Sequence, residues 1–129
     1  MTRTIVFTNR KGGVGKTTTT VNVAAALAHM GRSVLVIDGD PQAHATMSFG
    51  IHRNSIRYDL ADVATGRVPA DRALQSTYIS RLKVLPATRR LADFERRYAD
   101  DPQARIWFRD GIELVKHQFD FVCFDTPPR

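Results

Sequence analysis

The residues with the clearest chemistry form a glycine-rich segment near the start of the chain. It reads Lys11-Gly12-Gly13-Val14-Gly15-Lys16-Thr17-Thr18 and separates an apolar run from an alanine-rich run. Because glycines lack a Cβ atom, successive backbone N–H groups can converge on an oxyanion, and a helix N-terminus adds partial positive charge. Lys16 can reach the β- and γ-phosphates of a nucleotide, and the Thr17 hydroxyl is placed to bind Mg²⁺. Residues 11–18 are therefore predicted to be a phosphate-binding loop.

Two other interpretations of this segment compete with that prediction. One is a tight glycine turn that carries a lysine facing the solvent. The other is a dinucleotide-binding fingerprint, since Gly13 and Gly15 have its spacing and Asp38 follows about twenty residues later. Thr18 occupies the third glycine position of that fingerprint, however, and Lys16 has no role in it. The agreement of loop, lysine, hydroxyl and flanking elements favours the phosphate-binding loop.

Carboxylates follow two later apolar runs. Asp38-Gly39-Asp40-Pro41-Gln42 comes after residues 33–37, and Asp125-Thr126-Pro127-Pro128 comes after residues 121–124. A carboxylate at the end of a buried strand can hold Mg²⁺ through water if it faces the phosphates, and we expect this of Asp125. Asp38 and Asp40 are also compatible with a capped turn before Pro41. The nearby phosphate-binding loop favours a functional role for both.

The elements that must position these residues alternate between strands and helices. We expect strands over residues 4–8, 33–37, 81–85 and 121–124, the first and last of them buried. We expect helices over residues 17–30, 42–49, 58–64 and 69–76, and two more that begin near Thr88 and at Asp101-Pro102. Thr88 and Asp101 are expected to cap these last two helices, and Arg109 is expected to pair with Glu113. The first strand, helix and strand predict a right-handed parallel βαβ unit, and hence an α/β fold.

Composition places the chain among ordinary globular proteins. Its 129 residues suit one domain, and 43% hydrophobic with 25% charged residues excludes a disordered tail or a disulfide-rich miniprotein. No run approaches the roughly 18 to 20 apolar residues of a membrane span, so we expect a soluble cytoplasmic product. The single cysteine, Cys123, is expected to be buried, and the four histidines show no metal-ligand spacing and are expected at the surface.

The formal net charge is +6, from 19 basic and 13 acidic residues. Basic residues are concentrated between residues 81 and 109, where the sequence has Arg81, Lys83, Arg89, Arg90, Arg96, Arg97, Arg105 and Arg109. A basic protein tends to associate with polyanions, although net charge does not identify which one. The prediction for this segment is a solvated helical face.

The glycine-rich segment resembles the deviant Walker A motif, KGGxGKT, of the ParA/MinD family of P-loop ATPases. Arg10 stands where the strict Walker A pattern has its first glycine, and Lys11 is an additional lysine. Residues 38–42 resemble the second acidic motif of the family, DxDPQ, and residues 121–128 resemble its Walker B strand. Residues 9–46 are similar to the ParA/Soj partition branch. The resemblance implies a P-loop NTPase-like three-layer sandwich with a mostly parallel sheet.

The resemblance also implies roles for individual residues. The cofactors would be ATP and Mg²⁺, bound by residues 11–18. Lys11 resembles the signature lysine that reaches the partner's phosphates in a nucleotide-sandwich dimer, where it acts like an arginine finger. Asp40 matches the residue that orients or deprotonates the attacking water, so the catalytic set would be Lys11, Lys16 and Asp40. Asp38 would support the metal shell, which gives Thr17, Asp38 and Asp125 as the metal set.

The implied function is ATP hydrolysis for plasmid or chromosome partitioning, linked to a homodimer, nonspecific DNA at the nucleoid and a ParB-like activator. A MinD-like membrane-cycling ATPase and an inactive remnant that only binds nucleotide or a partner chain are the alternatives. A nitrogenase-reductase-like iron–sulfur protein needs paired cysteines, and Cys123 is alone. Because the chain stops at Arg129, just after the Walker B prolines, we expect residues 1–129 to be the N-terminal part of one domain. Its first strand would then lie at a sheet edge, and its activity would be low.

Overall fold

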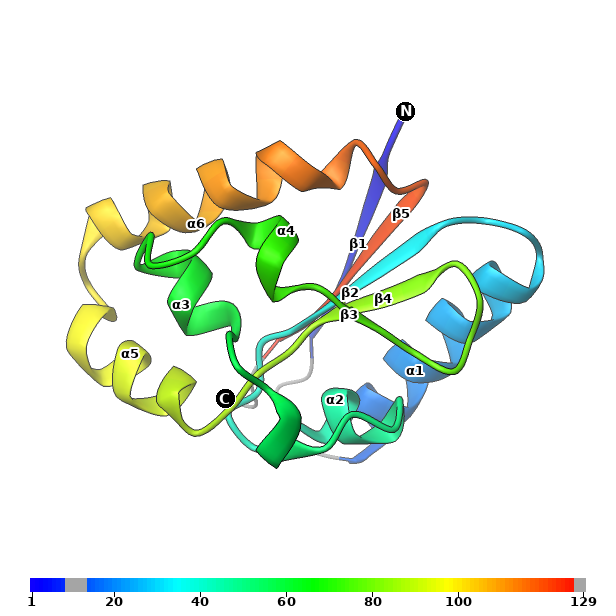
Figure 1. Cartoon of the computed structure of the whole chain (residues 1–129), viewed down its shortest axis with the longest axis horizontal. Coiled ribbons are helices and arrows are strands. Elements are labelled where there is room, and N and C mark those ends of the chain that lie inside the picture. The colour runs from blue at the N-terminus through cyan, green and yellow to red at the C-terminus, as the bar shows by residue number, and fades with distance from the viewer. Residues whose placement is uncertain (9–13, 127–129) are drawn as a thin grey trace.

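A five-stranded sheet forms the centre of the structure, with the strand order β1-β5-β2-β4-β3 (Figure 1). The computed structural model describes residues 1–8 and 14–126. The strands are β1 (Arg3–Phe7), β2 (Val34–Asp38), β3 (Gln75–Ser76), β4 (Leu82–Leu85) and β5 (Phe121–Asp125). Neighbouring strands pair in parallel, except that β3 pairs antiparallel with β4. The mostly parallel sheet expected from the sequence is confirmed.

Helices cover both faces of this sheet and complete the three layers (Figure 1). They are α1 (Val14–His29), α2 (His44–Ser48), α3 (Leu60–Ala64), α4 (Ala70–Ala73), α5 (Arg90–Tyr98) and α6 (Pro102–Lys116), with a short 3₁₀ helix η1 (Arg53–Ser55). One core cluster joins α1 and α2 to one face of the sheet, and the other joins α3, α4, α5 and α6 to the opposite face. Every residue of β2 is buried, as parallel strands covered on both faces should be.

The first strand differs from its prediction. Residues 4–8 were predicted to form a buried strand, yet β1 pairs with β5 alone among the described strands and lies at the edge of the sheet. Val6 in this strand is 55% exposed. The β-branched composition identifies a strand, but burial depends on which elements cover it. The prediction of an edge position for this strand is confirmed.

Several local predictions are confirmed and others are wrong. Asp101 caps α6 by accepting a hydrogen bond from the Gln103 N–H at 2.9 Å. The segment predicted as one helix over residues 69–76 instead contains α4 followed by β3. The N-cap of α5 is Arg89 rather than Thr88, although the Thr88 hydroxyl accepts from the Arg90 N–H at 3.2 Å.

The predicted pair between Arg109 and Glu113 is also wrong. The Arg109 guanidinium is 3.7 Å from its neighbour Asp110, and Glu113 accepts from the Lys116 ammonium at 2.6 Å. All of these side chains are substantially exposed. On an exposed helix face, alternative ion pairs differ little in free energy, so spacing alone does not select one of them.

Candidate functional site

The candidate site lies where the carboxyl ends of three parallel strands meet the start of α1. Asp125 at the end of β5 is in register with Phe7 of β1 on one side and with Asp38 of β2 on the other. Helix α1 begins at Val14, three residues earlier than the sequence predicted, so its first turn includes Lys16 and Thr17. The sheet therefore brings the acidic groups together, and α1 directs a cation and a hydroxyl toward them.

Asp125 is the centre of this arrangement and is fully buried. Its Oδ1 atom is 2.5 Å from the Lys16 ammonium and accepts a hydrogen bond from the Thr20 hydroxyl at 3.0 Å. Its Oδ2 atom accepts from the Thr17 hydroxyl, also at 3.0 Å. The Lys16 ammonium donates further to the Thr126 carbonyl. A buried carboxylate that accepts several charge-assisted bonds is held in one orientation.

Sequence reasoning did not find Thr20. It lies one helical turn beyond Lys16, and its hydroxyl donates to the Lys16 carbonyl at 2.9 Å as well as contacting Asp125. The signal was present, because residues four apart on a helix share a face. Thr20 is also fully buried, unlike the exposed Thr18 and Thr19 beside it.

Asp38 is held by a separate set of donors. Its Oδ2 atom accepts from the backbone N–H of Thr46 at 2.8 Å and from the Thr46 hydroxyl at 2.6 Å, and its Oδ1 atom accepts from the Asp40 N–H at 3.0 Å. Burial raises the pKa of Asp38 to about 6, although these hydrogen bonds act in the opposite direction. Thr46 is a second residue that sequence reasoning missed, and it joins α2 to the end of β2.

Asp40 is nearly buried and follows Asp38 on the turn that leads to α2. Its Oδ1 atom accepts from the Gln42 N–H at 2.9 Å, and its Oδ2 atom is 3.4 Å from Nδ1 of His44. Glu95 on α5 also faces this region: burial raises the pKa of its carboxyl, and the charge of Asp40 raises it further. The prediction that His44 lies at the surface is confirmed, with 58% of its side chain exposed.

The predicted nucleotide-binding residues are described only in part. Lys11, Gly12 and Gly13 lie outside the described residues, and Val14 is described through its backbone at the start of α1. Gly15 is exposed at the same end, and a Cβ atom built there would meet nothing within 4 Å. A cavity of about 430 Å³ opens here, lined by Val6, Phe7, Thr8, Gly15, Lys16 and Thr19. This volume lies within the range of small-molecule sites.

The oxygen donors beside this cavity fit Mg²⁺. The Thr17 hydroxyl and the Asp125 carboxylate are in direct contact, and Mg²⁺ prefers one or two carboxylate or hydroxyl oxygens completed by phosphates and water. Among the described residues, no group of three or more His, Cys, Asp or Glu side chains is arranged to hold an ion. A hydroxyl and a carboxylate leave most coordination positions of Mg²⁺ to phosphate and water oxygens.

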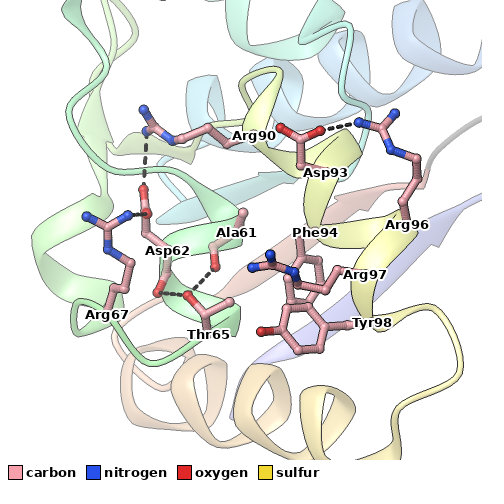
Figure 2. A pocket seen from close by; sticks show the side chains of 10 residues that line it. All are labelled: Ala61, Asp62, Thr65, Arg67, Arg90, Asp93, Phe94, Arg96, Arg97 and Tyr98. Atoms are coloured by element: carbon pink, nitrogen blue, oxygen red, sulfur yellow. Dashed lines mark hydrogen bonds and ion pairs between the residues drawn. The ribbon is translucent and has the colours of Figure 1, made fainter.

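A larger cavity, of about 800 Å³, lies between α3 and α5 (Figure 2). Four of its lining residues are arginines, namely Arg67, Arg90, Arg96 and Arg97. Asp62 is 3.6 Å from the Arg67 guanidinium and 3.2 Å from that of Arg90, and Arg96 pairs with Asp93, so three of these cations are already paired (Figure 2). None of the lining residues belongs to the predicted phosphate-binding loop or its acidic partners.

The sequence predicts a solvated basic face between residues 81 and 109. This prediction is confirmed for the arginines of that segment whose side chains the structure describes, because all of them are exposed.

The predictions for the cysteine and for the remaining histidines are confirmed. Cys123 is fully buried in β5, and burial raises the pKa of its thiol to about 11. The other three histidines, His29, His52 and His117, are exposed. Within residues 1–8 and 14–126, the structure contains no helix with the length and apolar character needed to cross a membrane.

Comparisons with known proteins agree with this geometry. A family model described as an AAA domain matches residues 2–129. The sporulation initiation inhibitor protein Soj of Bacillus subtilis is 36% identical over 128 residues, and the chromosome partitioning protein ParA of Caulobacter vibrioides is 37% identical over 128 residues. These matches cover 99% and 98% of this chain but 51% and 48% of the relatives. The chain thus spans about half the length of these relatives.

A solved structure gives the same result for the fold. Cobyrinic acid a,c-diamide synthase from Mycobacterium smegmatis, crystallised with an ATP analogue and magnesium, superposes with a TM-score of 0.92 and 33% identity. The match covers all of this chain and 52% of that one. The glycine-rich loop, the two acidic strand ends and these comparisons lead to one conclusion: the chain belongs to the family described as an AAA domain and to the ParA/MinD family of P-loop ATPases.

Proposed function

We propose that this chain binds ATP together with Mg²⁺ at the loop between β1 and α1. We further propose that it acts as a ParA-like ATPase in plasmid or chromosome partitioning. The observation that carries this proposal is the contact of both Lys16 and Thr17 with Asp125. These are a phosphate-binding cation, a metal-binding hydroxyl and a metal-binding carboxylate from distant parts of the chain. Relatives named for partitioning, and a similar structure solved with an ATP analogue and magnesium, support it.

Each residue has a physical role in this proposal. The Lys16 ammonium donates to the β- and γ-phosphates, in exchange for part of its present contact with Asp125 and the Thr126 carbonyl. Thr17 and Asp125 hold Mg²⁺, with Asp38 supporting the metal shell from β2. Bound Mg²⁺ would neutralise negative charge on the phosphates. Asp40 orients or deprotonates the attacking water, because a nearly buried carboxylate fixed by a backbone N–H is a suitable acceptor.

The remaining parts of the proposal concern assembly. Lys11 reaches the partner's phosphates in an ATP-dependent homodimer, and the dimer associates with nonspecific DNA and a ParB-like activator. DNA affinity is expected to fall steeply with salt, since phosphate contacts release counterions. These roles rest on the resemblance of the sequence to the family.

The first experiment titrates ATP with Mg²⁺ into the wild-type chain and the Lys16→Ala variant by calorimetry. A charge-assisted hydrogen bond contributes roughly 1.5 to 3 kcal/mol, so we expect binding to weaken by about 10- to 150-fold. Lys83→Ala is the matched control, because Lys83 is an exposed lysine on β4 away from the loop. Equal affinity of the wild type and Lys16→Ala would reject the binding site.

The second experiment separates binding from hydrolysis. Asp40→Ala should keep ATP affinity and lose turnover, since a water-orienting carboxylate acts mainly in the transition state. Lys11→Ala should keep binding by the monomer and lose the ATP-dependent dimer in light scattering. ATP binding without any turnover in the wild type would favour the inactive remnant, and ATP-dependent binding to anionic lipid vesicles would favour the MinD-like alternative.

A further inference from the structure

We propose that His44 is a positioning residue for the Asp40 carboxylate. This inference rests on the proposed function, in which Asp40 orients the water that attacks ATP. Nδ1 of His44 is 3.4 Å from Oδ2 of Asp40, while Oδ1 of Asp40 accepts from the Gln42 N–H at 2.9 Å. The two carboxylate oxygens thus face two different partners, one from the backbone and one from a side chain.

The turn before α2 is built so that these two side chains meet. The Ala43 N–H donates to the Asp40 carbonyl at 2.8 Å, and Ala43 adopts a left-handed conformation with φ of 60°. A residue with a Cβ atom adopts this conformation at some cost in free energy. Ala43 is also fully buried, which holds the turn in place. His44 is the first residue of α2 and follows Asp40 by four positions in the sequence. The turn between them places its side chain beside the Asp40 carboxylate.

A single hydrogen bond leaves a carboxylate free to rotate about its bond to Cβ. The Gln42 N–H fixes one oxygen of Asp40, and a second contact at the other oxygen fixes the plane of the group. For a carboxylate that must hold water in one direction, the plane decides where its remaining lone pairs point. His44 therefore acts on the reaction through Asp40, without contact with the substrate.

Other charged groups near this turn already have different partners. Lys16 contacts Asp125, and the Asp38 carboxylate is held by Thr46 and the Asp40 N–H. The Arg53 guanidinium donates to the Gln42 carbonyl at 2.9 Å. Glu95 on α5 also faces Asp40, and the charge of Asp40 adds to burial in raising the pKa of its carboxyl. Among the side chains that the structure describes, which do not include that of Arg105, His44 is the only basic one within 4 Å of the Asp40 oxygens.

The test compares His44→Ala with His44→Asn, because the Asn side-chain amide can occupy the place of Nδ1 and donate in the same direction. The readouts are the dissociation constant for ATP with Mg²⁺ and the single-turnover hydrolysis rate with protein in excess. Since the histidine is largely exposed, we expect His44→Ala to slow hydrolysis by roughly three- to fivefold and to change ATP affinity by less than about twofold. His44→Asn should restore most of the rate. His52→Asn, at another exposed histidine, is the control and should match the wild type.

A second measurement does not depend on activity. Long-range ¹H–¹⁵N spectra of histidine-labelled protein, recorded at about pH 8.5 where histidine is ordinarily neutral, report which ring nitrogen carries the proton. We expect the proton of His44 on Nδ1 in the wild type and on Nε2 in Asp40→Ala.

The outcomes separate this inference from the proposed function. A His44→Ala rate equal to that of the wild type, ATP affinity that falls in step with the rate, or a wild-type proton on Nε2 would each overturn the positioning role. An unchanged rate in Asp40→Ala would instead reject the role proposed for Asp40, and the inference with it. Absence of hydrolysis in the wild type, even with the proton on Nδ1, would show that the pair is merely structural and would also overturn the inference.

Discussion

The buried carboxylate of Asp38 should make the stability of this protein depend on pH in a definite direction. Burial raises its pKa from the ordinary value of 3.8 to about 6. Between these two values the folded chain binds a proton more tightly than the unfolded chain does. The free energy of unfolding must therefore fall as pH rises through this range, because ionisation is easier after unfolding.

The size of the effect follows from the shift. A difference of about 2 pKa units corresponds to about 3 kcal/mol, at about 1.4 kcal/mol for each unit. Most of this loss should occur between about pH 4 and about pH 7. Asparagine has the same shape as aspartate but does not ionise. The unfolding free energy of Asp38→Asn should therefore lack the pH-dependent loss that ionisation of Asp38 causes. The amide disturbs one of the hydrogen bonds from Thr46 or Asp40, which adds an offset that does not depend on pH.

The assay is urea unfolding followed by far-UV circular dichroism, at a series of pH values and in EDTA so that no metal binds Asp38. The quantity of interest is the difference in unfolding free energy between the wild type and Asp38→Asn. Asp71→Asn, at an exposed aspartate on α4, is the control, and its difference from the wild type should stay constant within about 1 kcal/mol. A difference for Asp38→Asn that also stays constant across the range would refute the argument that burial dominates at Asp38.

Three further predictions concern elements outside the site. Asp101→Ala removes the N-cap of α6 and should lower the unfolding free energy by about 1 kcal/mol in urea titrations; no loss would mean that the cap is dispensable. Val6→Lys places a charge on the exposed edge strand β1 and should reduce the self-association of the chain in light scattering. Aggregates of equal or larger size would argue against association of two chains through this edge. Cys123 should react with a thiol reagent only after unfolding, since it is fully buried and its pKa is raised to about 11; rapid labelling of the native protein would contradict this.

The phosphate-binding loop and the alternation of strands and helices could be predicted because their signals are local. Glycines, a lysine and a hydroxyl between a strand and a helix are typical of few structures besides a phosphate-binding loop, and apolar runs of strand length mark β2, β4 and β5. Asp101-Pro102 marked the start of α6 for the same reason, since capping depends on adjacent residues. Short exposed pieces were less predictable: β3 has two residues, and its pairing with β4 has no periodic signal.

The partners of the acidic residues could not be predicted in the same way. Thr20 and Thr46 are ordinary residues of helices in the sequence, and only the packing of α1 and α2 against the sheet brings their hydroxyls to Asp125 and Asp38. His44 likewise has no metal-ligand spacing, and its place beside Asp40 depends on the left-handed turn at Ala43.

Local patterns of residues were therefore enough to predict the candidate site residues and the order of the elements that carry them. Which carboxylate meets which donor depends on tertiary packing. Lys16 and Asp125 are 109 residues apart, and they meet because β5 inserts between β1 and β2. That strand order depends on long-range pairing and on the covering of both sheet faces by helices, which no local pattern of residues encodes. The same packing removes water from Asp38 and raises its pKa, although its neighbours in sequence give no sign of it.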